Sequence, residues 1–148
     1  MNRVLMFLIA LSVFVAGHSQ ITQNDGYYFK NGKLFTGTFE QHDDTGQLTA
    51  RISVKNGLPD GISEYYSGGK LVEKHSYRNG DKHGTWEQFE NEKKISEAIY
   101  HKDKKHDKWL IWDTNGTLRY EMYYKKGKKI GAWKMWDENG KLISEKTY

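Results

Sequence analysis

Residues 124–148 read YKKGKKIGAWKMWDENGKLISEKTY, and this stretch decides the fold. Its skeleton is a Tyr, two Gly residues spaced by four, the pair Trp133 and Trp136, an Asn-Gly turn, a Leu and a closing Tyr. The same skeleton recurs upstream at steps of 23 or 24 residues, starting at Tyr100, Tyr77 and Val54. Self-similarity at such a period predicts an array of stacked structural repeats. The predicted units span residues 54–76, 77–99, 100–123 and 124–148, preceded by a degenerate unit at 29–53.

Each unit contains two turn signals that divide it into two short segments. One lies near the start and is an Asn-Gly pair in the first three units, as in Asn79-Gly80. The other lies in the middle, as in Asn139-Gly140. Asn-Gly favours the type I′ turn of a β-hairpin, and the segments between turns have the aromatic and β-branched residues typical of strands. A helix is disfavoured, because each interior Gly costs about 1 kcal/mol. The sequence therefore predicts an all-β fold, a single-layer antiparallel meander of five tandem β-hairpin repeats with about ten strands.

The packing of such a meander follows from strand geometry. Two strands advance the sheet by about 9.6 Å per unit. The spacing of three between Trp133 and Trp136 places their rings on opposite faces unless a bulge intervenes. Gly131 is expected to leave room for a neighbouring ring against the backbone. No unit buries its apolar face alone, so we expect rings of adjacent hairpins to stack, each contact contributing about 0.5–1.5 kcal/mol.

Composition limits the classes of protein that the chain represents. It has 148 residues, a net charge of +4, 14% aromatic residues and no cysteine. The aromatic content argues against disorder. The lack of cysteine excludes a disulfide scaffold, thiol catalysis and thiolate metal sites.

The N-terminus predicts export. A basic residue, Arg3, precedes an apolar run over residues 4–16, and the small residues Gly17 and Ser19 follow. This order is typical of a secretory signal peptide, here residues 1–19, and the run is shorter than the roughly 20 residues of a membrane span. The mature chain is then expected to begin near Gln20, with a lead-in at 20–28, in the periplasm, at the cell surface or in the medium.

The repeated skeleton resembles the MORN repeat and, more closely, the shorter variant of YwqK-family antitoxin-like proteins of bacteria. The resemblance is good over residues 54–148 and weak over 29–53. It implies a single-layer antiparallel sheet without enzymatic activity that contacts proteins or lipids, and the antitoxin name implies neutralisation of a toxin partner. The chain departs from the pattern at Asp103 and Asp107, where Gly is expected, and at Asn91-Glu92, which replaces the mid-unit Gly.

Ionisable residues that recur along the chain are candidates for catalysis or metal binding. Four glutamates recur every 24 residues, namely Glu73, Glu97, Glu121 and Glu145. A catalytic acid needs an apolar pocket that raises its pKa, and one layer of sheet offers none, so these residues are expected to pair with lysines on the solvated face. His83 and His106 occupy equivalent positions about 10 Å apart, too far to share a metal. The sequence predicts no catalytic residue, no metal site and no cofactor.

Two candidate binding surfaces remain. The candidate aromatic face comprises Trp86, Trp109, Trp112, Tyr123, Trp133 and Trp136. The candidate basic patch comprises Lys102, Lys104, Lys105, Lys108, Lys125, Lys126, Lys128 and Lys129. Exposed apolar patches mark interaction sites, and a basic patch attracts anionic partners, although lysines at turns also keep a ribbon soluble.

The predicted function is that of an exported, non-enzymatic repeat scaffold that binds another protein, with an antitoxin-like or immunity-like role implied by the resemblance. The alternative is a cell-envelope module that binds glycan or anionic lipid. Nucleic acid is disfavoured as a partner because the chain is predicted to be exported. The end strands near Phe29 and Tyr148 are predicted to have unpaired edges, so self-association is a further mode of contact.

Overall fold

The structure, a computed structural model, describes residues 20–148, so the signal peptide predicted at 1–19 lies outside the described residues. Every regular element in the described part is a strand, which confirms the all-β class. No helix in residues 20–148 has the length and apolar character to cross a membrane. The strands are β1 (Ile21–Asn24), β2 (Tyr27–Lys30), β3 (Lys33–Leu34), β4 (Gly37–His42), β5 (Leu48–Lys55), β6 (Leu58–Ser67), β7 (Lys70–Arg78), β8 (Asp81–Glu90), β9 (Lys93–His101), β10 (Lys104–Trp112), β11 (Leu118–Lys125), β12 (Lys128–Trp136) and β13 (Leu142–Thr147).

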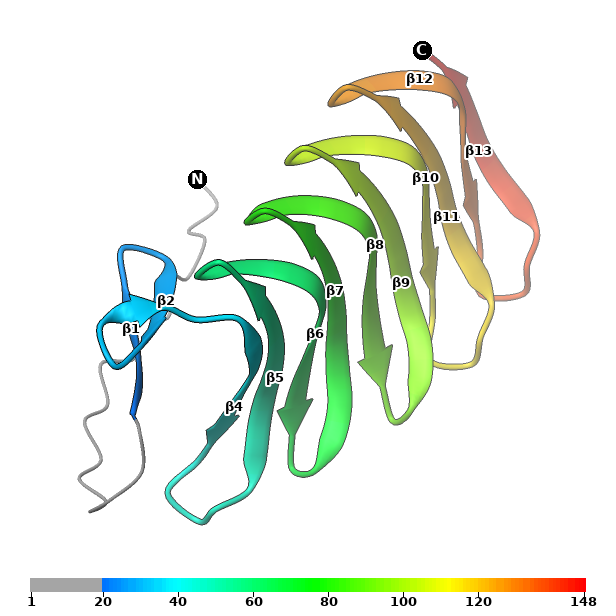
Figure 1. Ribbon diagram of the computed structural model, residues 1–148. Helices are drawn as coiled ribbons and strands as arrows, with labels where there is room; N and C mark the ends of the chain where they lie inside the picture. The colour runs from blue at the N-terminus through cyan, green and yellow to red at the C-terminus, as the bar shows by residue number, and fades with distance from the viewer. Residues whose placement is uncertain (1–19) are drawn as a thin grey trace.

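The strands form two antiparallel sheets (Figure 1). β4 to β13 make a ten-stranded meander in which every strand pairs with its neighbours in the chain, and β1, β2 and β3 make a small separate sheet. In Figure 1 the hairpins lie side by side from β4 to β13, and their upper ends curl over. This arrangement confirms the predicted single-layer meander of tandem hairpins.

The turns at the upper ends of the hairpins have the predicted type. Both central residues have positive φ, 50° and 78° at Asn56 and Gly57, as a type I′ turn requires. Lys102 and Asp103 adopt the same conformation, with φ of 48° and 63°. The Asp103 carboxylate accepts a hydrogen bond of 2.8 Å from the Lys82 backbone N–H. The aspartate therefore replaces glycine because its side chain links one turn to the preceding hairpin.

Three of the turns at the opposite ends are built around an aspartate. The Asp43 carboxylate accepts hydrogen bonds from the Thr45 hydroxyl at 2.6 Å and the Gln47 N–H at 2.9 Å. These bonds hold the pKa of Asp43 below its usual value. Asp113 and Asp137 accept equivalent bonds from the backbone N–H groups that follow them. An Asp at the first position therefore stabilises each of these loops by hydrogen bonds within the loop.

The curl of the hairpins coincides with a bulge in each of β6, β8, β10 and β12. The pairing register with the preceding strand shifts there, and one residue of the bulge has a positive φ. Extra residues in one strand bend it and increase its twist. The residues with positive φ are Gly61, Gly84, Asp107 and Gly131, with φ of 101°, 95°, 52° and 62°.

The bulge glycines do not have the predicted role. A Cβ at Gly84 would lie 3.1 Å from the Cβ of Ser76, and one at Gly131 would lie 4.0 Å from the Cβ of Tyr123. No aromatic ring lies against either position, so the expectation that Gly131 makes room for a ring is wrong. Glycine serves the left-handed conformation of the bulge, which Asp107 also adopts because aspartate tolerates it better than most residues.

The first predicted unit differs from the others. Phe29 lies in β2 of the small sheet, so the predicted edge near Phe29 is wrong, and the first edge of the large sheet is β4. The predicted lead-in holds β1 and the start of β2. Tyr28 is buried, its ring 5.1 Å from that of Phe39, and its N–H donates to the Gly57 carbonyl at 2.8 Å. The small sheet therefore closes this end by packing on the buried Ala50, Ile52 and Val54.

The other end of the sheet is open. β13 is the edge strand, as predicted near Tyr148, and all of its residues are exposed. Leu142 and Ile143 are 44% and 51% exposed. An unpaired edge with exposed apolar side chains can template pairing with another chain. Self-association through this edge stays a prediction.

Candidate functional site

A continuous row of rings crosses one face of the ten-stranded sheet, which we call the ladder face. Tyr and Trp alternate along it, so that each hairpin contributes to the contact with the next. Neighbouring ring centroids lie 5.0 to 5.5 Å apart, with interplanar angles between 53° and 63°. Aromatic pairs prefer such tilted geometries, and the row confirms the predicted stacking between hairpins. Its members are Tyr77, Trp86, Tyr100, Trp109, Tyr124, Trp133 and Tyr148.

The three ladder tryptophans are held in the same way. Each follows the positive-φ residue of its bulge by two positions and lies beside the register shift. Each indole N–H donates to a backbone carbonyl ten residues earlier, on the preceding strand. Bulge and tryptophan therefore work together, because the indole satisfies a carbonyl next to the irregular pairing. The bonds run from Trp86 to Ser76 at 2.9 Å, from Trp109 to Ile99 at 3.2 Å and from Trp133 to Tyr123 at 3.1 Å.

A lysine lies over each ladder tryptophan and also near the following tyrosine. Each lysine precedes its tryptophan by four residues, a Lys-x-x-x-Trp signal that is visible in the sequence and that sequence reasoning missed. An ammonium group over an indole face is stabilised by the ring quadrupole. The distances from Nζ to the ring centroid are 4.1 Å for Lys82 over Trp86, 4.0 Å for Lys105 over Trp109 and 4.2 Å for Lys129 over Trp133.

These three lysines have no acidic partner within residues 20–148, where every ion pair involves other residues. Burial, together with the charge of Lys129, lowers the pKa of Lys105. The ladder face therefore carries positive charges that the rings hold in place and that no carboxylate neutralises.

The second unit replaces the ladder tryptophan by Ser63, which is fully buried. His75, directly opposite Ser63, stacks on Trp86 with a centroid distance of 3.6 Å and an interplanar angle of 12°. Burial, with the charge of Lys82, lowers the pKa of His75 to about 4. The imidazole is therefore neutral at neutral pH, and its Nε2 lies 3.0 Å from the Glu73 carboxylate.

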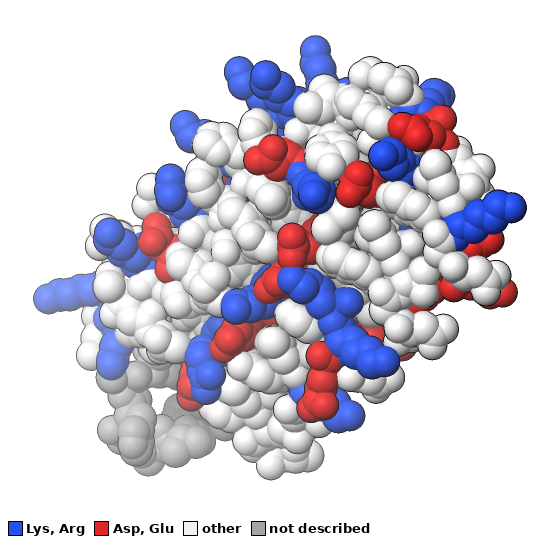
Figure 2. All heavy atoms as spheres, turned by 90° about the vertical axis from the view of Figure 1, so that its right-hand side faces the viewer, with Lys and Arg blue, Asp and Glu red and all other residues white. Residues whose placement is uncertain are grey.

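The opposite surface of the sheet, which we call the charged face, carries a row of directly opposed residues across all ten strands. Two like charges meet in it, Glu87 and Glu97, and Lys94 bridges them at 2.8 and 2.6 Å. These hydrogen bonds raise the pKa of Lys94. Basic and acidic side chains are interleaved on the side of the molecule shown in Figure 2. The row is Glu40, Arg51, Glu64, Lys74, Glu87, Glu97, Leu110, Glu121, Lys134 and Glu145.

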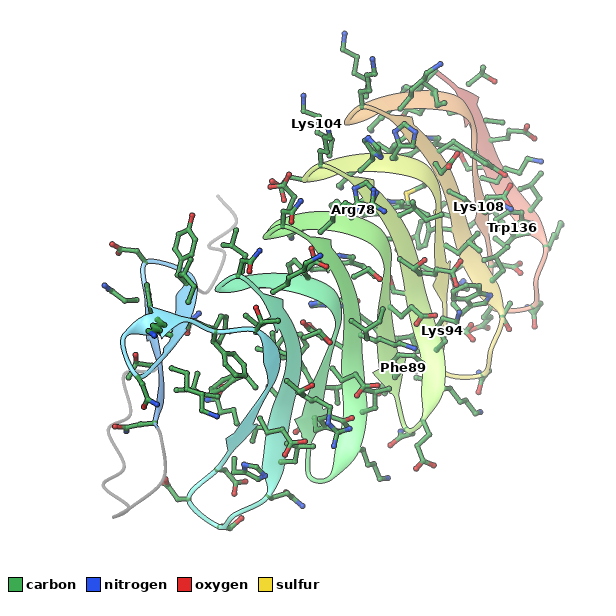
Figure 3. The ribbon with its side chains drawn as sticks, in the orientation of Figure 1. Arg78, Phe89, Lys94, Lys104, Lys108 and Trp136 are labelled. Carbon is green, nitrogen blue, oxygen red and sulfur yellow. The ribbon has the colours of Figure 1, made fainter. Side chains whose placement is uncertain are left out.

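A second aromatic series lies on the charged face, with one ring from each of four units. Its members are half-buried and recur at steps of 23 or 24 residues. Unlike the ladder indoles, the indoles of Trp112 and Trp136 donate no hydrogen bond and contact no other ring within residues 20–148. Figure 3 shows Phe89 and Trp136 along this side of the ribbon. The series is Tyr66, Phe89, Trp112 and Trp136.

The structure divides the candidate aromatic face between the two surfaces. Trp86, Trp109 and Trp133 belong to the ladder face, where they pack within the sheet. Strand alternation places the other members, Trp112, Tyr123 and Trp136, on the charged face. Trp133 and Trp136 therefore lie on opposite faces, as predicted. A binding role for either set stays a prediction.

The candidate basic patch is gathered at one edge of the sheet. The turns after β9 and β11 are neighbours, since the Gly127 N–H donates to the Lys105 carbonyl at 2.8 Å. Lys104 extends from this edge in Figure 3. Lys108 differs, because it lies on the charged face over the ring of Tyr123 at 5.8 Å. The exposed members at or beside the two turns that contact no ladder ring are Lys102, Lys104, Lys125, Lys126 and Lys128. Lys105, which is half-buried, and Lys129, which is exposed, lie over the ladder rings.

The recurring glutamates do not form one series. Glu97 lies on the charged face and binds Lys94, as predicted, and Glu121 and Glu145 both lie opposite Lys134. Glu73 is on the ladder face, so its assignment to the series is wrong. Equivalent positions of the units that hold Glu73 and Glu97 lie 23 residues apart, so the residue equivalent to Glu97 is Lys74, which the register places in the charged row.

The recurring histidines are joined by a third. The ring of His101 lies between those of His83 and His106, with centroid distances of 4.7 and 5.6 Å. The His106 Nδ1 accepts a long hydrogen bond of 3.4 Å from the Lys126 N–H. Within residues 20–148, no group of three or more His, Cys, Asp or Glu side chains is placed to hold a metal ion.

The described geometry is that of a repeat in which three units share one Trp, Lys and Tyr arrangement. Three segments of the chain match a MORN repeat variant. They are residues 59–79, 108–126 and 129–148, which include the Ser63 unit and the ladder positions of Trp109 and Trp133. MORN repeats commonly serve as interaction modules for proteins or membrane lipids and are scaffolds. No curated protein matches the chain.

Proposed function

We propose that this protein is an exported, non-enzymatic scaffold that binds another protein through the aromatic series of its charged face. The observation that carries the proposal is the contrast between the two sets of tryptophans. All three ladder indoles have hydrogen-bond and ring partners inside the sheet. Trp112 and Trp136 have neither within residues 20–148, and both are half-buried, so the exposed part of each ring and its indole N–H are available to a partner.

The surroundings of these two rings fit a protein interface. Tryptophan is enriched among residues that contribute most to protein binding. The row of alternating charges beside them gives a partner a defined electrostatic pattern, which favours specificity. Arg119 supports the site, because its Nε donates to the Trp136 carbonyl at 2.9 Å and its guanidinium lies 3.5 Å from Asp113.

The test compares capture of a partner by wild type and two variants. Trp112→Ala combined with Trp136→Ala is expected to abolish capture of a specific protein from the native envelope fraction, because it removes both unpartnered rings. Tyr120→Ala is the matched control, since Tyr120 is a 39% exposed aromatic residue on the ladder face. Equal capture by the double variant and wild type would contradict the proposal. Mass spectrometry of the captured protein tests the narrower antitoxin-like role, which requires a toxin.

A second candidate function is contact with the anionic lipid of the cell envelope. It is favoured by the five exposed lysines at or beside the neighbouring turns after β9 and β11. Each lysine near an anionic membrane contributes about 1 kcal/mol. The protein is expected to sediment with phosphatidylglycerol vesicles at low salt and less as salt rises. Lys125→Ser combined with Lys126→Ser should weaken sedimentation, whereas no sedimentation at low salt would exclude this function.

A further inference from the structure

One position beside the ladder, on the same face, holds a small side chain. Large side chains lie directly opposite two of the ladder tryptophans on the neighbouring strands. His75 is opposite Trp86, and Met122 is opposite Trp109. Between the two tryptophans lies Ala98, which is opposite both. Alanine is the smallest of the three side chains, and a hollow of about 300 Å³ lies above it. The hollow is thus a consequence of one small residue where the neighbouring units place a large one.

The hollow has aromatic and polar sides. Trp86, Trp109 and Tyr100 line one part of it. Both faces of Trp86 are already covered, by His75 at 3.6 Å and by Lys82 at 4.1 Å. The ring face that is open to a ligand is therefore that of Trp109 on the side of Ala98. Gln88 and Ser96, which lie directly opposite each other in the next row of the same face, line the other. The amide and hydroxyl groups supply donors and acceptors close to the apolar ring surfaces. Ligand sites combine an apolar lining with a few placed polar groups in this way, and this volume is at the lower limit of such sites.

The lysines restrict which ligand fits. An aromatic cluster often binds a cationic ligand, but here Lys82 Nζ already lies 4.1 Å from the Trp86 centroid and 5.2 Å from that of Tyr100. Lys105 lies over Trp109 in the same way. A cationic ligand would therefore have to share these rings with an ammonium group. Glu73 and Glu87 also line the hollow, so an acidic ligand is disfavoured. A neutral ligand with an apolar face and a polar rim is compatible with the rings, the lysines and the carboxylates.

We infer that the hollow between Trp86 and Trp109 binds one pyranose ring of a glycan. The C–H groups of the pyranose contact the open face of Trp109, while its hydroxyl groups are placed to exchange hydrogen bonds with Gln88 and Ser96. His75 and Met122 bound the row on either side, so the site takes a single sugar and not a chain laid along the sheet. This site lies on the face opposite Trp112 and Trp136, and it goes beyond the proposed protein binding.

Saturation-transfer NMR with the folded, mature protein tests the inference. The probes are the methyl glycosides of glucose, galactose, mannose and N-acetylglucosamine at millimolar concentration, with N-acetyl-leucinamide and N-acetyl-tyrosinamide as mimics of a partner side chain. We expect saturation of the ring protons of at least one glycoside. If no glycoside is saturated, or if only the amino-acid amides are, the assignment to a sugar is wrong.

Two variants locate the binding. Ala98→Met places in the hollow the side chain that Met122 provides next to Trp109, and it should weaken glycoside binding roughly ten-fold or more. Tyr120→Ala is the matched control, because it removes an exposed ring of the same face that does not line the hollow, and it should leave binding unchanged. Unaltered binding by folded Ala98→Met would overturn the inference. If that variant does not fold, Gln88→Ala decides, since Gln88 is exposed and its loss should weaken binding without disturbing the packing.

Discussion

Replacing Trp109 by alanine is expected to lower the free energy of unfolding by about 3 kcal/mol, the lower end of the usual loss for a large aromatic side chain in a core, because the ring is half-buried. The ring lies near the middle of the ladder, with centroids 5.5 Å from Tyr100 and 5.2 Å from Tyr124. Its removal also deprives the Ile99 carbonyl of a 3.2 Å hydrogen bond and Lys105 of its ring contact. All four interactions disappear together.

The loss has a second expected consequence. In a repeat array each unit contacts only its neighbours, so stability is the sum of unit and interface contributions. Weakening the interface at Trp109 should therefore separate the array into two parts that unfold at different urea concentrations.

Urea denaturation followed by circular dichroism measures both effects. Trp112→Ala is the matched control, because Trp112 has the same side chain in the same strand but faces the other surface without a ring partner. We expect it to cost about 1 kcal/mol or less. If the two variants lost the same stability, the ladder would not be the structural core.

Acidification is expected to remove on the order of 3 kcal/mol of stability through His75. Burial, with the charge of Lys82, lowers its pKa to about 4 in the folded state, whereas an unfolded histidine has a pKa of about 6.5. The unfolded chain therefore binds a proton first as the pH falls. The stability associated with neutral His75 is fully present above pH 6.5 and is lost as the pH falls from about 6.5 to about 4.

His75→Phe isolates this contribution, because phenylalanine can stack on Trp86 but does not titrate. Unfolding free energies of both proteins should be measured between pH 7 and pH 4. The difference between them is expected to change by on the order of 3 kcal/mol in favour of the variant at low pH. Parallel pH profiles would show that His75 is not the group responsible.

Most of the fold was predictable because the repeat encodes it locally. Asn79-Gly80 and its equivalents determine the turns, and the period determines which strands pair. The spacing of Trp133 and Trp136 placed them correctly on opposite faces. The small sheet was not predictable in this way, because Tyr28 packs on residues of β5 through contacts that no repeat pattern contains.

The surfaces were harder to predict than the fold. The face on which a residue lies depends on its distance in sequence from each bulge. Glu73 lies 24 residues before Glu97 instead of the 23 that separate equivalent positions, so it lies on the ladder face and not on the charged face. The role of Lys105 was missed because lysines between turns were considered only as a charged patch, although their spacing from Trp109 repeats. The site at Ala98 depends on one small residue where the neighbouring units have His75 and Met122. Only the strand register shows that these three residues occupy equivalent positions.

The two ends of the large sheet differ, and this gives the array a polarity of growth. At the β4 end, a further hairpin would have to displace Tyr28 from its contact with Phe39. At the β13 end, Tyr148 already lies beside Trp133 and beneath Lys129, so another unit would meet a complete set of contacts. Of the two ends, only this one accommodates a further repeat without displacing existing contacts, and each added copy would bring one more indole held between a bulge and an ammonium group.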